Sequence, residues 1–309
     1  YPDYYSGWEE GKPDIVLVKF VSEYATSRLM LEKGEADMVD FVPVDQVEEL
    51  SKVEGVSIKT YPSYEALYLQ FNYEKAPTDD KLVRQALAYA FNYDGIAKIT
   101  NDTAKQLTSI LPSSMWGFKE ETFKYSFDLE KAKQLISQSG YADKKITITA
   151  AYATEDDLQR QLIEMYKSDL EKIGVTLDIK TGPWSTIASN QKDPATSCNI
   201  FSRYWWPDYV DPNDFVYYLL HSNANYKYSY YKNPEMDKLI EDAHKIGGVD
   251  KNKAIEMYGQ IQDMAAEDAN SICVFEKSTL VPMRTWVKDY VYNPGYPRII
   301  QFYNLKIEK

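Results

Sequence analysis

The part of this sequence best suited to chemistry is residues 203–212, where aromatic, acidic and basic side chains are gathered. The segment reads Arg203-Tyr204-Trp205-Trp206-Pro207-Asp208-Tyr209-Val210-Asp211-Pro212. A carboxylate in such a segment can bind a ligand cation or accept hydrogen bonds, and the rings can pack against a flat ligand. Two carboxylates among aromatic rings also raise the alternative of a glycoside hydrolase, which places one acid on each side of a sugar bond.

The spacing of the two acids argues against hydrolysis. Asp208 and Asp211 lie three residues apart in one loop, so we do not expect them to flank a bond. The sequence has no GxSxG, HExxH, phosphate-binding loop or GxGxxG pattern. With only His221 and His244, we expect neither a zinc site nor bound nickel or haem. The sequence therefore predicts a binding protein without a cofactor, and not an enzyme.

Composition narrows the choice of partner. The formal net charge of -12 repels phosphate backbones and no basic cluster with interleaved aromatic residues offsets it, so we expect no nucleic-acid partner. The chain has 27 Tyr and 6 Trp against 11 Phe, and tyrosine suits both wet binding clefts and half-buried surfaces. No stretch approaches the roughly 20 apolar residues that a membrane-spanning helix needs. For Cys198 and Cys273, one disulfide and two free thiols both remain open.

Alternating strands and helices must position the aromatic-acidic segment, and this order favours an α/β fold with a parallel sheet. The predicted strands lie at 15–21, 36–41, 56–59, 64–71, 145–150, 175–180, 199–203, 272–275 and 299–307. The first predicted helix ends at 33 and is capped by either Ser22 or Ser27, and the others lie at 43–50, 79–91, 129–138, 154–173, 237–245 and 253–267. We expect Gly34 and Gly140 to end two of these helices. The strand at 199–203 leads directly into the aromatic-acidic loop.

Several segments resemble, in the same order, motifs of the family 5 extracellular solute-binding proteins, the peptide-binding receptors of ABC importers. These segments are LEKGEAD (31–37), LQFN (69–72), DKLVRQALAYA (80–90), DLEKAKQL (128–135), GY (140–141), IGV (173–175), WWPDYVDP (205–212), NPEMD (233–237) and EDA (267–269). Residues 1–5 resemble a segment that follows a long additional region in this family. The resemblance therefore implies the C-terminal part of a longer receptor.

The resemblance implies a two-lobed α/β fold of the periplasmic-binding-protein kind, with lobes that close over a ligand and with the N-terminal part of lobe I lacking here. Residues 1–72 would form part of lobe I, residues 73–277 lobe II, and residues 278–309 the return to lobe I. The implied location is extracytoplasmic, either periplasmic or lipid-anchored at the outer face of the cell membrane. The implied protein partners are the permease subunits of an ABC transporter.

The resemblance also assigns roles within the loop. Asp208 resembles the family aspartate that pairs with the amino terminus of a bound peptide, and Trp205 resembles the tryptophan beside it. We expect Trp206 and Tyr209 to line a pocket, Asp211 to cap a helix, and Arg203 either to hold a ligand carboxylate or to pair with a structural acid. An oligosaccharide is the alternative ligand, with its rings stacked on Tyr204, Trp205 and Trp206 and its hydroxyl groups bonded to Asp208.

Overall fold

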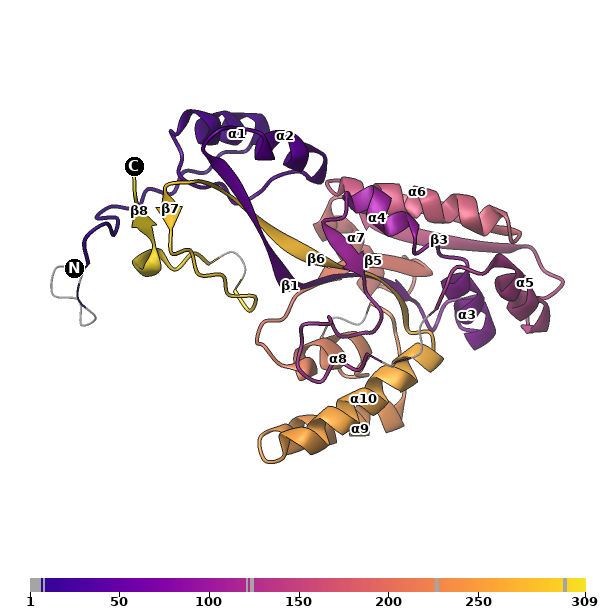
Figure 1. Ribbon diagram of the computed structural model, residues 1–309. Coiled ribbons are helices and arrows are strands. Elements are labelled where there is room, and N and C mark those ends of the chain that lie inside the picture. The colour runs from indigo at the N-terminus through magenta and orange to yellow at the C-terminus, as the bar shows by residue number, and fades with distance from the viewer. Residues whose placement is uncertain (1–6, 8, 121, 123–124, 226–227, 297–298) are drawn as a thin grey trace. The chain divides into compact units, whose positions relative to one another are not determined.

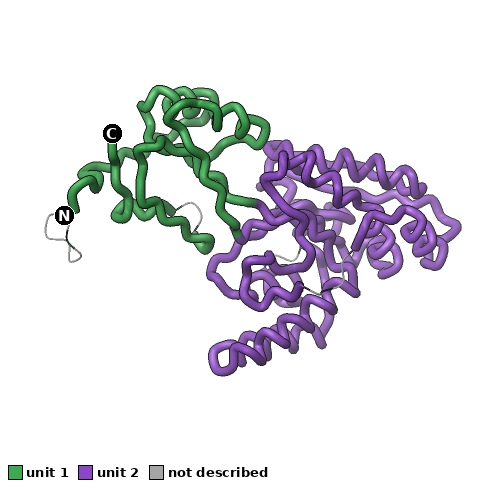
Figure 2. The backbone as a smooth tube through the Cα atoms, viewed as in Figure 1, with its two compact units in different colours: residues 1–63, 278–309 green, residues 64–277 purple. Residues whose placement is uncertain are grey.

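The computed structural model describes residues 7, 9–120, 122, 125–225, 228–296 and 299–309. The chain divides into two compact units, unit 1 with residues 1–63 and 278–309 and unit 2 with residues 64–277 (Figure 2). Two long strands, β1 (Val56–Phe71) and β6 (Ser271–Arg284), each contribute residues to both units. The predicted lobe boundaries after residues 72 and 277 stay a prediction. The segment 1–5 lies outside the described residues.

Unit 2 is built on a mixed sheet, which holds six strands in the order β2-β6-β1-β5-β3-β4 (Figure 1). The parallel part joins β3 to both β4 and β5, while β1 pairs with β5 and β2 with β6 in antiparallel fashion. The further strands are β2 (Ala104–Gln106), β3 (Ile146–Ala153), β4 (Val175–Gly182) and β5 (Ile200–Trp205). The helices are α3 (Lys81–Tyr89), α4 (Gly95–Thr100), α5 (Leu129–Gln138), α6 (Asp157–Glu171), α7 (Trp184–Lys192), α8 (Pro212–Leu220), α9 (Pro234–Gly247) and α10 (Lys251–Glu267).

Strand β1 separates two hydrophobic cores, because successive side chains of a strand point to opposite faces of a sheet. Leu67, Leu69 and Phe71 pack into a core that includes buried residues of α3, α5 and α6. Ala66 and Tyr68 pack into a second core with residues of α8, α9 and α10. Because both faces of the sheet are covered by apolar layers, residues 66–71 at the end of β1 are all buried, as expected for a central strand.

Unit 1 contains smaller elements around two smaller hydrophobic clusters. Its elements, besides the outer ends of β1 and β6, are α1 (Tyr24–Lys33), the 3-10 helix η1 (Val44–Gln46), α2 (Val47–Ser51), β7 (Val287–Lys288), the 3-10 helix η2 (Phe302–Asn304) and β8 (Lys306–Ile307). Helix α1 ends as predicted: Gly34 has a φ of 71° and its N–H donates to the carbonyl of Leu31. Glycine adopts this left-handed conformation without steric cost.

The prediction of a buried strand at 15–21 is wrong. The segment has no strand pairing, and Ile15 and Phe20 are 85% and 100% exposed. Its apolar run has the composition of a strand, but a strand also needs a partner for its N–H and C=O groups. Among the described residues no partner strand lies beside it.

Three further local predictions need correction. Within 36–41 only Met38 forms a bridge, with Met283. Of the strand expected at 299–307, only β8 is a strand, because the chain turns through η2 just before it. Gly140 is not a helix cap: α5 is capped by Ser139 in an extended conformation, and the N–H of Gly140 donates to Asp80 Oδ2 at 3.0 Å.

Both cysteines are free thiols. None of the helices in the described part of the chain is long and apolar enough to cross a membrane.

Candidate ligand-binding loop between β5 and α8

The aromatic-acidic segment forms the connection from β5 to α8 in unit 2, and we call residues 206–211 the Asp208 loop. The loop ends at a well-formed helix start, where Asp211 Oδ1 accepts the N–H of Asn213 at 2.9 Å and Pro212 occupies the first turn. Aspartate is a favoured N-cap because its side chain satisfies a free N–H group of the first turn, and proline suits the position after it. The capping role expected for Asp211 is therefore what its side chain performs.

A carboxylate beneath the loop holds it in place. Asp214, in the first turn of α8, is 0% exposed. Its Oδ1 accepts the indole N–H of Trp205 at 3.0 Å, and its Oδ2 accepts the backbone N–H of Asp208 at 3.2 Å. Burial raises the pKa of Asp214 to about 6, because desolvation disfavours the charged form more than these hydrogen bonds favour it.

Four residues of the loop, Trp206, Asp208, Tyr209 and Val210, are exposed, whereas Pro207 is buried. Asp208 is exposed, and Trp206 and Tyr209 are 52% and 41% exposed. Tyr209 is also restrained, since its hydroxyl accepts the side-chain N–H of Asn213 at 2.9 Å. The loop therefore presents an exposed carboxylate, fixed through its own backbone, between exposed aromatic rings.

Arg203 and Trp205 lie on one face of β5, below the loop. Arg203 is 2% exposed, and its guanidinium lies 4.7 Å from the ring centroids of both Trp205 and Tyr228. It also donates to Gln70 Oε1 at 3.4 Å. The guanidinium of Arg203 is therefore buried in unit 2, and it packs directly against the Trp205 ring.

Tyr204 points to the other face of the sheet, as the alternation of a strand requires. Its ring packs against the first core, 6.1 Å from the ring of Phe275, while Trp205 belongs to the second core. The ammonium of Lys277 lies 5.6 Å from the centroid of the Tyr204 ring. The structure therefore brings Arg203 and Trp205 together and separates Tyr204 from them.

Sequence reasoning missed Asp214 and Tyr228. Asp214 has a local signal, because an acidic residue three positions after an N-cap acid lies in the first helical turn, where carboxylates are favoured. Tyr228 has no such signal. It lies 25 positions after Arg203 in the printed sequence, and only the fold brings its ring to the guanidinium.

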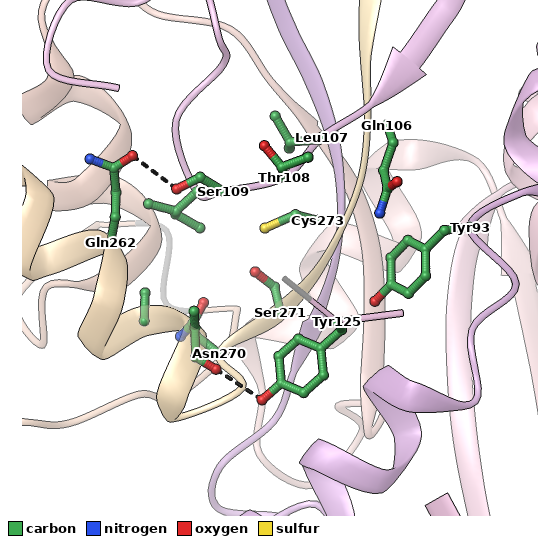
Figure 3. Close-up of a pocket in the computed structure, with 13 residues that line it drawn as sticks. Tyr93, Gln106, Leu107, Thr108, Ser109, Tyr125, Gln262, Asn270, Ser271 and Cys273 are labelled. Carbon is green, nitrogen blue, oxygen red and sulfur yellow. Dashed lines mark hydrogen bonds between the residues drawn. The ribbon is translucent and has the colours of Figure 1, made fainter. Parts of the chain in front are cut away.

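Unit 2 also contains a small internal cavity, apart from the Asp208 loop, which has no room for a peptide or an oligosaccharide (Figure 3). It measures about 30 Å³ and lies between Tyr93, Tyr125, Gln262 and the start of β6. The amide of Asn270 is 0% exposed there, and its oxygen and nitrogen have no hydrogen-bond partner among the described residues. A polar cavity of this volume suits one or two water molecules.

No group of three or more His, Cys, Asp or Glu side chains in the described part of the chain could hold a metal ion. His221 is buried, and its Nδ1 accepts the N–H of Asn223 at 3.0 Å, whereas His244 is exposed on α9. The expectation that this chain carries no nickel or haem stays a prediction.

The comparisons with known proteins identify the class. The model of the bacterial extracellular solute-binding proteins, family 5 Middle, matches residues 1–227. The chain belongs to the bacterial extracellular solute-binding proteins of family 5. The resemblance drawn from the sequence motifs is confirmed, and so is the α/β fold class.

Individual relatives are similar over most of this chain. It is 29% identical over 283 residues to the probable D,D-dipeptide-binding periplasmic protein DdpA of Escherichia coli, covering 90% of this chain and 54% of DdpA. It is 28% identical over 309 residues to heme-binding protein A of Haemophilus influenzae, covering 97% of this chain and 55% of that protein. The chain thus spans about half the length of the curated relatives it matches.

Solved structures share the fold. The periplasmic binding protein DppA from Helicobacter pylori, in complex with the peptide STSA, matches with a TM-score of 0.80 at 23% identity. The match covers 94% of this chain and 56% of that one.

Proposed function

We propose that this chain is part of the extracytoplasmic substrate-binding component of an ABC importer, and that its ligand is a peptide. Within it, Asp208 binds the amino terminus of the peptide. Trp205 lies beneath the loop and supports it, while Trp206 and Tyr209 contact the ligand's side chains. Arg203 supports Trp205 from below.

One observation carries this proposal. Asp208 is an exposed carboxylate whose backbone N–H is tied to the buried Asp214 carboxylate at 3.2 Å. A peptide ammonium that leaves water needs an anionic partner, and a charge-assisted hydrogen bond of this kind contributes about 1.5–3 kcal/mol. Fixing Asp208 before the ligand arrives reduces the entropy cost of forming that bond.

The names of the relatives support a peptide as the ligand. DdpA and a second similar protein of Escherichia coli, 28% identical over 302 residues, are both described as dipeptide-binding. The description of heme-binding protein A shows that ligands differ within the set of relatives. The peptide assignment for this chain therefore depends on Asp208 as well as on these names.

The remaining parts of the proposal follow from the family. A role in import requires the permease subunits of an ABC transporter as partners and a location outside the cytoplasm. The chain acts by binding and not by catalysis. Asp208 is exposed while Asp211 is engaged in capping α8, so this loop offers one free carboxylate where a glycoside hydrolase needs two.

The test is native mass spectrometry of the full-length protein, followed by denaturation to release and identify any ligand that co-purifies. A series of peptide masses supports the proposal. A hexose series contradicts the peptide assignment and supports oligosaccharide uptake, with the exposed ring of Trp206 as a stacking surface.

A further inference from the structure

The buried carboxylate of Asp214 contacts both the Asp208 loop and β5. Its two oxygens accept the indole N–H of Trp205 and the backbone N–H of Asp208. These donors come from the last residue of β5 and from the middle of the connection, whereas Asp214 belongs to α8. A single side chain therefore fixes the loop and the Trp205 ring relative to the helix.

We propose that Asp214 is a positioning residue for ligand binding, which holds Asp208 and Trp205 in their binding geometry through these hydrogen bonds. This inference rests on the function proposed above. Asp214 itself is fully buried and does not touch the ligand. It acts through the backbone of Asp208 and the indole of Trp205.

The arrangement requires a carboxylate at this position. An ionised carboxylate accepts hydrogen bonds at both oxygens, whereas an amide of the same shape offers one acceptor and one donor group. In an Asp214→Asn variant, the NH₂ group would face either the indole N–H or the N–H of Asp208. One of the two anchors is lost in either orientation, and a buried donor is left unsatisfied.

The ionised form of Asp214 is stabilised by the dipole of α8 and destabilised by burial. Its place in the first turn of α8 puts it at the positive end of the helix dipole. The Asp208 carboxylate, which raises the pKa of Asp214, and the hydroxyl of Tyr209, whose own pKa Asp214 raises, both lie on the loop. Since burial raises the pKa of Asp214 to about 6, protonation in mildly acidic solution would replace one acceptor by a donor and loosen the loop.

The first test uses the wild-type, full-length protein without ligand. The indole N–H signal of Trp205 is followed by ¹⁵N NMR from about pH 5 to about pH 8, with Trp205→Phe to assign it. We expect this signal to shift with a midpoint near pH 6, because its acceptor is the Asp214 carboxylate. An indole N–H that exchanges with solvent as fast as that of an exposed tryptophan across this range would overturn the proposal, because Asp214 would then not hold the Trp205 ring.

The second test measures the affinity of a trialanine peptide by calorimetry for wild type, Asp214→Asn and the control Asp250→Asn. Asp250 caps α10 through a hydrogen bond to the N–H of Lys253, which asparagine also makes, so the control removes one acid from the same unit. We expect Asp214→Asn to weaken binding about tenfold or more and the control to leave it unchanged. We also expect wild-type affinity to fall below about pH 6, beyond any fall seen for Asp214→Asn.

The outcomes separate this inference from the proposed function. Wild-type affinity that depends on Asp208 but is unaffected by Asp214→Asn contradicts the positioning role alone. If the full-length protein binds no peptide, the proposed function is contradicted. If its indole signal still titrates near pH 6, the hydrogen bonds by which Asp214 holds the loop are nevertheless supported. If Asp214→Asn does not fold, the indole titration of the wild type and the pH dependence of its affinity decide the matter.

Discussion

At the scale of single residues, two buried charges lie behind the Asp208 loop. The guanidinium of Arg203 packs between two aromatic rings, and the carboxylate of Asp214 accepts hydrogen bonds from the loop. Burying charge is costly unless neighbouring groups compensate it. Both residues gain that compensation from Trp205, which stacks on Arg203 and donates to Asp214.

The packing of Arg203 predicts that Arg203→Lys destabilises the protein by about 1–3 kcal/mol, since lysine has no planar group to stack between Trp205 and Tyr228. Urea denaturation measures this loss. The matched control is Arg160→Lys on α6, whose side chain forms surface ion pairs with Asp157 and Glu164, and this change should alter stability by less than about 0.5 kcal/mol. Equal losses in the two variants would contradict the packing role of Arg203.

The burial of Asp214 predicts a specific dependence of stability on pH. Its pKa is about 6 in the folded protein against an ordinary value of 3.8. Between these values the folded state binds more protons than the unfolded state, so this group lowers the free energy of unfolding as pH rises. Relative to Asp214→Asn, wild type should lose about 2–3 kcal/mol between about pH 4 and about pH 7. Parallel stability curves for the two proteins would refute this.

At the scale of elements, the connection from β5 to α8 combines a central strand with a capped helix. Residues of β5 are hydrogen-bonded on both sides, to β1 and to β3. The helix begins at an aspartate cap followed by proline. A short loop between two such elements has little freedom, which is what a preformed binding site requires.

The cap of α8 predicts different effects for two substitutions of Asp211. Asp211→Ala removes the acceptor for the N–H of Asn213 and should cost about 1 kcal/mol. Asp211→Asn keeps an acceptor and should cost only a few tenths of that. Thermal unfolding of both variants checks the difference, and an equal cost would show that capping is not what Asp211 contributes.

Several elements of unit 2 could be predicted from the sequence because each carries its own signal, whereas α4, α7, α8 and β2 were not predicted. Helix α6 shows a long apolar stripe, and β3 and β4 form the parallel pair that a β-α-β order implies. The segments 15–21 and 299–307 could not be predicted correctly, because apolar composition does not show whether a partner strand exists. At the site, the loop and its cap were predictable, whereas the contact between Arg203 and Tyr228 depends on the fold.

At the scale of the whole molecule, the binding proposal uses groups of one unit. The Asp208 loop, its anchor Asp214 and the supporting Arg203 all belong to unit 2, which also contains the largest hydrophobic core cluster of the described residues. The chain spans about half the length of its curated relatives. Ligand affinity is therefore a property to be measured on the full-length protein.

The most direct test of the central claim compares trialanine with N-acetyl-trialanine, by calorimetry, on full-length wild type and on Asp208→Asn. Acetylation removes the ammonium and the substitution removes the carboxylate, so each breaks the same proposed contact. We predict that acetylation weakens binding to wild type by about tenfold or more and has little further effect on Asp208→Asn. If wild type binds both ligands equally well, Asp208 does not recognise a peptide amino terminus, and the account is contradicted.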